Sequence, residues 1–222
     1  MKNITALTVF YKTTHLVDIS LKALRVFYPD IKLIVVNNSP EDDECTTALV
    51  EFAKEDKKTL IVQLDKNYGH GPGLNRGMEY VETPFVYIFD SDSEIIKEGM
   101  LENMVNVIDS HTYGTGFTRI TSLGGSHRDG GSLDDPDVMT YLHPLACVIS
   151  MHQYNKFPKF TSGGAPFNRA CSAIKDTGNA EMLIKFFPVI KGARGAGAAN
   201  YIRHHNGQTR ARYGICSPHV GE

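Results

Sequence analysis

The sequence predicts an α/β fold in which a mostly parallel central sheet is flanked by helices. Short apolar runs alternate with segments of helical periodicity through the first half of the 222-residue chain. Hydrophobic residues make up 41% of the sequence, which is enough for a buried core. One apolar run, residues 85–89, ends on the carboxylates Asp90 and Asp92. Strands that alternate with helices are joined by right-handed crossovers, so their sheet is mostly parallel and covered on both faces.

Four strands separated by three helices account for the first half. β-Branched and aromatic residues dominate the apolar runs, and the segments between them place apolar residues three or four positions apart. In residues 14–27 this spacing continues up to Tyr28-Pro29, where a helix is expected to end. A glycine-rich turn precedes the third helix. The predicted strands are residues 4–11, 31–36, 59–64 and 85–89, and the predicted helices are residues 14–27, 44–56 and 72–80.

The second half continues the pattern less regularly. We expect a helix over residues 98–110 and a strand over residues 113–120 in the same layer. Residues 122–137 hold several glycines and Pro136 among polar residues, and this composition predicts a long surface loop. Further along we expect a strand over residues 141–150, a helix over residues 180–187 and a flexible glycine-rich stretch over residues 192–197. The whole chain is expected to form a single domain.

The cysteine spacing and the hydropathy of the sequence indicate in which compartment of the cell the protein is expected. The four cysteines are widely spaced without a C-x-x-C pair, which argues against a zinc ribbon and against a compact disulfide framework. No apolar run reaches the length of about 18 residues that crosses a bilayer, and the amino-terminal segment is too polar for a signal peptide. We therefore expect a cytoplasmic protein without a transmembrane segment.

Charge is unevenly distributed although the formal net charge is only −2. Residues 1–150 hold 13 Lys and Arg against 22 Asp and Glu, a balance of −9, whereas residues 151–222 hold 10 against 3, a balance of +7. Clustered basic side chains attract anions such as the phosphates of a small substrate, nucleic acid or an acidic membrane surface. The alternative is that they only balance the acidic part of the chain.

Asp90 and Asp92 are the first candidate site. Ligands of open α/β sheets bind at the carboxyl ends of the strands. Two hard oxygen ligands on a rigid strand end suit Mg²⁺ or Mn²⁺, which commonly take further ligands from a substrate phosphate. The alternative is that the two acids begin a turn and cap the next helix. The sequence thus predicts a metal site for a phosphate-bearing substrate.

Four motifs follow one another in a fixed order. They are the end of the first strand, residues 35–39 with acids at 41–44, the turn 67–69 leading to residues 73–77, and Asp90-Ser91-Asp92. Over residues 4–105 this order resembles that of family 2 glycosyltransferases, which have a GT-A, Rossmann-like fold. The resemblance implies a nucleotide-sugar donor and a divalent metal. It also divides the expected domain into a nucleotide-sugar-binding half, residues 1–92, and an acceptor-binding half, residues 93–222.

The resemblance implies that strand ends and turns of the first half hold the nucleotide. Asn37 lies where the family commonly has an aspartate that contacts the base or the ribose, and its amide can still donate and accept hydrogen bonds. Arg76 could pair with a phosphate, or it lies on a solvated helix face. A UDP-sugar is the favoured donor. The implied contact residues are Phe10, Tyr11, Asn37, Asn38, Asn67, Gly69, Asn75, Arg76, Asp90 and Ser91.

For the metal, the resemblance implies Asp92 and Asp90, with Asp92 as the acid that meets the ion directly. Residues 201–210 are similar to the late H-x-x-G-G-T segment of some GT-A enzymes, and the spacing to Thr209 selects His204 as a third ligand. Gln208 departs from that segment, and a pair of surface histidines is the alternative. Because histidine can bind Mn²⁺ beside carboxylates, the implied cofactor is Mn²⁺ or Mg²⁺.

The implied reaction is attack by an acceptor hydroxyl on the sugar while the nucleoside diphosphate leaves. Arg194 lies in a basic, glycine-rich stretch that either closes over the diphosphate and stabilises it or is a simple linker. An inverting enzyme needs a carboxylate base. The family's usual Glu-Asp pair is missing, so Asp176 is the candidate base. A rival set is Asp134, Asp135 and Asp137, and without a base a retaining mechanism becomes possible.

These observations predict a metal-dependent hexosyl- or pentosyltransferase acting on a hydroxyl acceptor. An anionic acceptor fits the basic second half: a glycan or lipid-linked acceptor, or a hydroxymethylated base in modified phage DNA. Aromatic and basic side chains alternate over residues 152–160, where they either stack on nucleotides or form a packed edge of the core. The alternatives to this function are a nucleotidyl- or phosphotransferase, and a non-catalytic module that binds nucleotide sugars or nucleic acid.

Overall fold

The computed structural model describes residues 3–123, 133, 135–162, 165–186 and 201–205. Helices and strands alternate along the first half of the chain. These elements are β1 (Ile4–Phe10), α1 (Thr14–Leu16), the π-helical turn η1 (Val17–Leu21), α2 (Lys22–Phe27), β2 (Lys32–Asn37), α3 (Glu44–Glu55), β3 (Thr59–Gln63), α4 (His70–Met78) and β4 (Phe85–Phe89). The later elements are β5 (Ser93–Ile95), α5 (Met100–Asn106), β6 (Gly114–Ser122), β7 (Val138–Ser150), α6 (Met151–Tyr154), α7 (Asn168–Asp176), α8 (Ala180–Leu183), β8 (Ile184–Phe186) and β9 (Ile202–His204).

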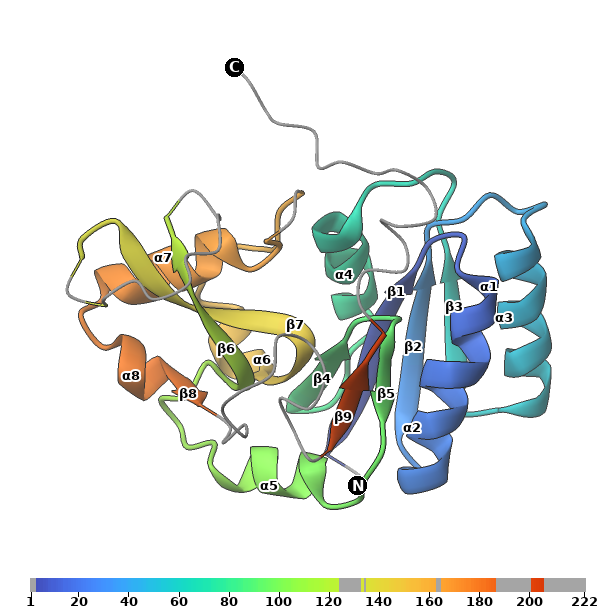
Figure 1. Cartoon of the computed structure of the whole chain (residues 1–222), viewed down its shortest axis with the longest axis horizontal. Coiled ribbons are helices and arrows are strands. Elements are labelled where there is room, and N and C mark those ends of the chain that lie inside the picture. The colour runs from blue at the N-terminus through green and yellow to red at the C-terminus, as the bar shows by residue number, and fades with distance from the viewer. Residues whose placement is uncertain (1–2, 124–132, 134, 163–164, 187–200, 206–222) are drawn as a thin grey trace.

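Seven strands form the central sheet in the order β3-β2-β1-β4-β7-β6-β8 (Figure 1). β1 pairs in parallel with β2 and with β4, and β2 pairs in parallel with β3. β7 runs antiparallel to β4 on one side and to β6 on the other, and β6 pairs in parallel with β8. Only β7 therefore runs against the others, and the sheet takes strands from both halves of the chain.

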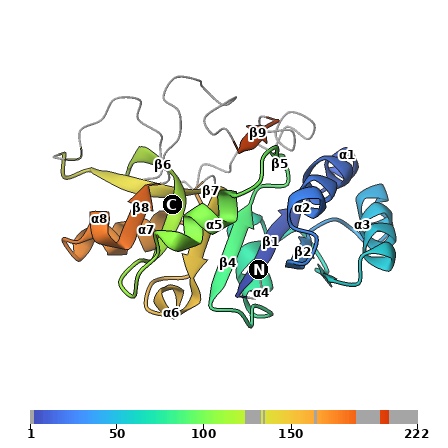
Figure 2. The same ribbon diagram turned by 90° about the horizontal axis from the view of Figure 1, so that it is seen from below.

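Apolar side chains cover both faces of the sheet. Successive residues of a strand point to opposite faces, so Phe10 joins the core that contains Leu24 of α2, whereas Leu7 joins the core that contains Leu74 of α4. Helices α1 to α3 and α5 contribute to the first core, and α4, α6 and α7 contribute to the second. Figure 2 shows α4 and α6 on one side of the sheet and β5 with β9 on the other.

Glycines set the start and the close packing of α4. Gly69 precedes the helix with φ +87°, in the left-handed region that favours glycine. Within the helix, a Cβ at Gly77 would lie 2.2 Å from Cδ1 of the fully buried Leu7 on β1. The helix therefore lies directly against the sheet, and its first residue, His70, is brought to the carboxyl edge of the strands.

A second, two-stranded sheet joins distant parts of the chain. β5 and β9 pair antiparallel, with Ser93 opposite His204 and Ile95 opposite Ile202. Both isoleucines are buried and belong to the same core as Leu24. This pairing brings β9 beside the segment that directly follows β4.

The structure confirms the predicted elements of the first half to within two residues at either end, and it confirms the strands at 113–120 and 141–150 in extended form. The predicted helix over residues 98–110 is confirmed only as the shorter α5. The predicted helix over residues 180–187 is wrong in its second half, because residues 184–186 pair with β6 as strand β8. Pairing with a distant strand outweighs the local preference of so short a segment. Most of the predicted loop over residues 122–137 and the glycine-rich stretch over 192–197 lie outside the described residues.

Candidate functional site

Asp90 and Asp92 follow directly on the buried strand β4. The backbone N–H of Asp90 donates to the carbonyl of Leu145 on β7 over 3.4 Å, and the N–H of Ser93 donates back to the carbonyl of Asp90 over 2.9 Å. The chain therefore turns tightly at the strand end. Asp92 is 8% exposed, so its carboxylate is held at the edge of the sheet rather than free in solvent.

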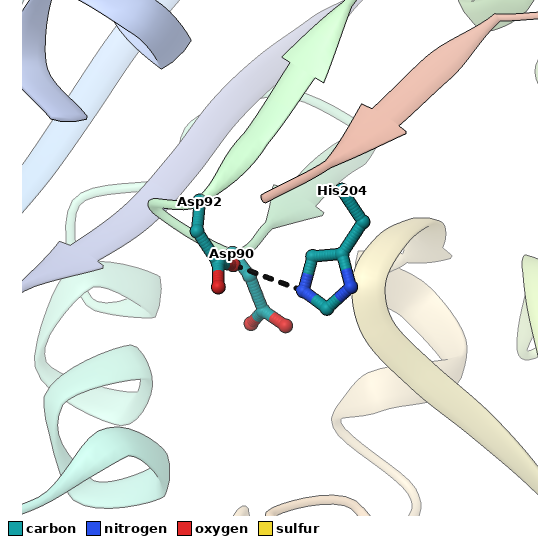
Figure 3. Close-up of side chains that lie close together, drawn as sticks. All are labelled: Asp90, Asp92 and His204. Atoms are coloured by element: carbon teal, nitrogen blue, oxygen red, sulfur yellow. Dashed lines mark hydrogen bonds and ion pairs between the residues drawn. The ribbon is translucent and has the colours of Figure 1, made fainter. Parts of the chain in front are cut away.

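His204 completes a cluster with these two acids. Its place in β9 opposite Ser93 directs its imidazole toward Asp92, and Nε2 of His204 lies 3.2 Å from Oδ1 of Asp92. The backbone N–H of His205 also donates to the carbonyl of Asp92 over 2.9 Å. One ligand atom from each of Asp90, Asp92 and His204 lies within 4.8 Å of the other two (Figure 3). The three residues predicted as metal ligands are thus brought together.

The negative charges of Asp90 and Asp92 favour binding of a cation at the cluster. Burial, the largest effect, lowers the pKa of His204, but the hydrogen bond to Asp92 and the charges of Asp92 and Asp90 together raise that pKa above its usual value. Neighbouring carboxylates repel each other, and a positive charge close to both of them offsets this repulsion. Two carboxylate oxygens and an imidazole nitrogen are also a donor set that Mn²⁺ accepts. The residues present therefore fit a divalent metal ion.

His70 is a neighbour of the cluster that the sequence did not reveal. Its Nε2 lies 3.5 Å from Oδ1 of Asp90, and its side chain is 32% exposed. It is the first residue of α4, directly after the turn at Gly69. The glycine-rich turn before a helix was visible in the sequence, and a histidine inside that turn was the clue that could have identified it.

Glu94 holds β9 in place beside the cluster. Its Oε2 lies 2.9 Å from Nε2 of His205 and 3.1 Å from Nη1 of Arg203. Both partners flank His204, so one carboxylate holds the residues on either side of the predicted metal ligand. Glu94 is also the residue that pairs with Arg203 in the β5–β9 ladder.

Asn37, the last residue of β2, and Asn38 after it make different hydrogen bonds. Asn37 is fully buried, and its amide group donates to Thr46 and Gln63 and accepts from the backbone of Ser39. Its hydrogen bonds thus stabilise the strand end, and its contact with a nucleotide base stays a prediction. Asn38 donates to the carbonyl of Gly69 over 3.1 Å, so it ties the end of β2 to the turn that starts α4.

The other residues predicted to contact the nucleotide lie near the same edge of the sheet. Phe10 is fully buried in the core, whereas Tyr11 next to it is half-buried. Asn67 is exposed, and its side-chain oxygen accepts from the N–H of Gly69 over 2.8 Å. Ser91, between the two acids, is 9% exposed.

Asn75 and Arg76 point in different directions from α4. Asn75 accepts from the N–H of Phe160 and from the hydroxyl of Tyr154, and it donates to the carbonyl of Phe160 over 2.7 Å. It therefore attaches the segment after α6 to the helix. Arg76 pairs with Glu79 over 3.3 Å on the exposed face of the helix, as the alternative of a solvated face describes.

The structure does not bring the predicted base to the cluster. Asp176 is exposed at the carboxyl end of α7, where the chain continues through α8 to β8 at the edge of the sheet. Arg194 and Asp134 lie outside the described residues. Asp135 and Asp137 lie just before β7, and the backbone N–H of Asp137 donates to the carboxylate of Asp135 over 2.9 Å.

The aromatic side chains of residues 152–160 belong to the core. Tyr154 and Phe160 are each 3% exposed, and their rings lie 5.2 Å apart. Phe157 packs edge-on against the buried Tyr113. The packed edge of the core is therefore the correct alternative, and these rings do not offer a platform for nucleotides.

The sequence itself identifies the family. Residues 5–165 match the family model "Glycosyl transferase family 2", and this match covers well over half of the chain. The chain belongs to Glycosyl transferase family 2. The matched region includes β1 to β7 with Asp90 and Asp92, whereas His204 lies beyond it.

Two curated relatives of this family 2 glycosyltransferase are named for teichoic acid synthesis. The chain is 29% identical over 97 residues to a teichoic acid poly(glycerol phosphate) polymerase of Staphylococcus epidermidis, which covers 43% of the chain and 13% of the relative. It is 29% identical over 85 residues to the minor teichoic acid biosynthesis protein GgaB of Bacillus subtilis, which covers 38% of the chain and 9% of that protein. The chain thus spans a small part of the length of these relatives.

Solved structures confirm the GT-A fold. The mannosyltransferase PcManGT of Pyrobaculum calidifontis, in complex with GDP-Man and Mn²⁺, matches with a TM-score of 0.61 at 15% identity over 85% of this chain and 57% of that one. Residues 1–349 of S. aureus TarS in complex with UDP-GlcNAc match with a TM-score of 0.57 at 17% identity over 90% of this chain and 58% of that one. The predicted fold and enzyme class of the family 2 glycosyltransferase are confirmed. Among its described residues, no helix has the length and apolar character needed to span a bilayer.

Proposed function

We propose that this chain is a metal-dependent glycosyltransferase that moves a sugar from a nucleotide-sugar donor to a hydroxyl group of a phosphate-containing acceptor. The observation that carries the proposal is the cluster of Asp90, Asp92 and His204, whose ligand atoms lie within 4.8 Å of one another. The cluster lies at the carboxyl end of β4, where sheets of this kind bind their ligands.

The donor class is supported by the structural neighbours. PcManGT binds GDP-Man with Mn²⁺, and TarS binds UDP-GlcNAc. We extend to this chain only the class of nucleotide sugars, with a UDP-sugar as the favoured member. Tyr11, Asn38 and the turn at Gly69 lie at the same sheet edge as the cluster and are the proposed contacts of the nucleotide.

A divalent cation held by Asp90, Asp92 and His204 would neutralise negative charge on the departing diphosphate. The imidazole in this set favours Mn²⁺ over Mg²⁺, because Mg²⁺ prefers oxygen ligands. The chain's own groups keep this centre in shape, since Asp92 is held by His204 and Asp90 by the turn after β4. Asp176 as the base and Arg194 as the residue that stabilises the leaving group stay predictions.

A phosphate-containing acceptor is supported by two observations. The relatives act in the synthesis of teichoic acid, and one of them polymerises glycerol phosphate. Residues 151–222 carry an excess of seven positive charges, which would attract an anionic acceptor. A hydroxymethylated DNA base is less favoured, because the aromatic rings that were expected to stack on it are buried in the core.

The test is a screen of UDP-, GDP-, TDP- and CMP-sugars with Mn²⁺ or Mg²⁺ that measures release of the free nucleotide. We expect release that stops with EDTA and in Asp92→Asn. The control is Asp18→Asn, an exposed aspartate of η1 that pairs only with Lys22 among the described residues. Equal release by Asp92→Asn and by the wild type would rule out the proposed metal site.

The same assay separates the reaction classes and the acceptors. A glycosyltransferase releases the nucleoside diphosphate or monophosphate of its donor, whereas a nucleotidyltransferase that used a nucleoside diphosphate sugar would keep the nucleotidyl group on its acceptor and release a sugar phosphate. Glycerol phosphate oligomers, neutral glycans and hydroxymethylated duplex DNA are then compared as acceptors. We expect stimulation of release by the glycerol phosphate oligomers, and stimulation by the DNA alone would contradict the proposed acceptor class.

A further inference from the structure

A cavity lies beside β6 and β8. The described residues of β8 pair with residues 114–116 of β6, and β6 extends to Ser122. The cavity has a volume of about 370 Å³, and its described lining comes from β6, β7, α8 and β8 together with Leu133. None of these lining residues belongs to β1 to β4, where the proposed donor contacts lie. The cavity is therefore separate from the nucleotide side of the sheet.

Arg119 is the positive group of this cavity. Its side chain is exposed on β6 and makes no hydrogen bond or ion pair with the described residues. In the ladder of β6 with β7, Arg119 lies opposite Tyr141, and β7 is the strand whose Leu145 carbonyl accepts from the backbone N–H of Asp90. Arg119 thus lines the cavity from the strand next to β7, which itself contacts the proposed metal centre.

The rest of the lining suits a polyol. Glu181 on α8 makes no hydrogen bond or ion pair with the described residues, so its carboxylate can accept hydrogen bonds from hydroxyl groups. Thr118 and Thr140 add two hydroxyl groups that can donate or accept. Ile120 and Ile184 provide the apolar wall. A volume of this size lies within the usual range for small-molecule sites, about 300–1,000 Å³.

We propose that this cavity binds a polyol phosphate unit of the acceptor, with Arg119 on the phosphate and Glu181 on a hydroxyl group. The planar guanidinium can form two parallel hydrogen bonds to phosphate oxygens, which gives both affinity and orientation. In the sheet only β7 separates β6 from β4, so a polyol phosphate chain bound here would extend toward the strand end at Asp90 and present its next hydroxyl group to the donor sugar. This inference rests on the proposed function, because it names a binding site for that acceptor.

The test measures binding without donor and without metal, so that it is independent of sugar transfer. The probe is sn-glycerol 3-phosphate, compared with glycerol and with inorganic phosphate, and binding to the whole chain is measured by calorimetry. We expect Arg119→Ala to weaken binding of sn-glycerol 3-phosphate about tenfold or more, the usual effect of losing a hydrogen bond to a charged group. Arg119→Lys should restore part of the affinity, and Glu181→Gln should weaken binding of glycerol phosphate but not of inorganic phosphate.

The matched control is Arg169→Ala, which removes an exposed arginine of α7 that does not line the cavity. Thermal melting of each variant checks that it is folded. Equal weakening by Arg119→Ala and Arg169→Ala, or no binding of the probe by the wild type at millimolar concentration, would overturn the proposal. The nucleotide-release screen decides the transferase function separately, because its failure would leave the result of the calorimetric experiment unchanged.

Discussion

Asp92 and His204 lie 112 positions apart in the sequence, and their side chains meet at 3.2 Å. Strand β4 fixes Asp92, since the acid follows a strand that is paired on both sides. His204 depends instead on β9, a short strand whose ladder with β5 consists of three residue pairs in the described part of the chain. In the proposed metal centre, Asp92 is therefore held by a rigid strand end, whereas the position of His204 depends on a short strand.

Removing the imidazole should weaken metal binding. We expect His204→Ala to lower the affinity for Mn²⁺ at least about tenfold, because even residues outside the coordination shell commonly contribute factors of 10–100. The affinity is measured by calorimetric titration of the whole chain with Mn²⁺. The control is His152→Ala, an exposed histidine of α6 without a partner among the described residues. A wild-type affinity in His204→Ala would show that the ion does not use this histidine.

Weakening the attachment of β9 should also lower the affinity for Mn²⁺, but by a smaller factor. Glu94→Gln removes the negative charge that holds Arg203 and His205, and exposed ion pairs are worth about 0.2–1 kcal/mol each. We therefore expect Mn²⁺ affinity to fall about two- to fivefold. Hydrogen exchange of the amides in β9 should also become faster, which a purely electrostatic effect on the metal would not cause.

Glu98→Gln is the matched control for this variant. Glu98 is exposed and has no partner among the residues that the structure describes. It carries the same charge only four positions from Glu94. If both substitutions lower the affinity equally, long-range charge and not the attachment of β9 explains the effect.

The first half of the fold could be predicted because its information is local. In β2 and β4 a continuous apolar run predicts a strand buried on both faces, and Pro29 and Gly69 mark where helices end and begin. The acids at 90 and 92 were identifiable for the same reason, since they directly follow such a strand. Strands β5, β8 and β9 have three residues each and form only because distant partners pair with them.

The site shows the same division between local and distant information. His204 was found through resemblance to a family segment, whereas the holding role of Glu94 depends on the register of β5 with β9, which no local pattern contains. Asn75 shows a role that the sequence did not predict. Its position in the family motif predicts a contact with the nucleotide, which stays a prediction, and in the structure its amide holds the backbone of Phe160.

Asn75→Ala should lower stability. The substitution leaves the N–H and the carbonyl of Phe160 and the hydroxyl of Tyr154 without their partner, in a part-buried position. We expect the free energy of unfolding to fall by about 1–3 kcal/mol, the usual cost of unsatisfied buried polar groups. Urea unfolding followed by circular dichroism measures this change. Asn106→Ala, at an exposed end of α5, is the control, and an equal loss in both variants would show that Asn75 has no special role.

Stability should depend on pH through Asp56. Burial acts most strongly and raises the pKa of this carboxyl, but the hydrogen bonds from Thr59 and Lys58 and the pairing with Arg25 together lower it below its usual value. Arg25 lies 2.5 Å from Asp56, and both side chains are at least five-sixths buried. Because the pKa is lower in the folded state than in the unfolded chain, the carboxylate stabilises the fold above about pH 4, and this contribution is lost as the pH falls toward the folded-state pKa.

We therefore expect Asp56→Asn to lower the free energy of unfolding by about 1.5–3 kcal/mol at pH 7 and by progressively less below pH 4, as measured by urea unfolding at pH 7 and below pH 4. The exposed Asp30, which pairs with Lys58, provides the control variant Asp30→Asn, whose effect should be smaller at pH 7. A difference between wild type and Asp56→Asn that stays constant down to pH 3 would contradict the assignment, because it would show that loss of the charge is not the cause.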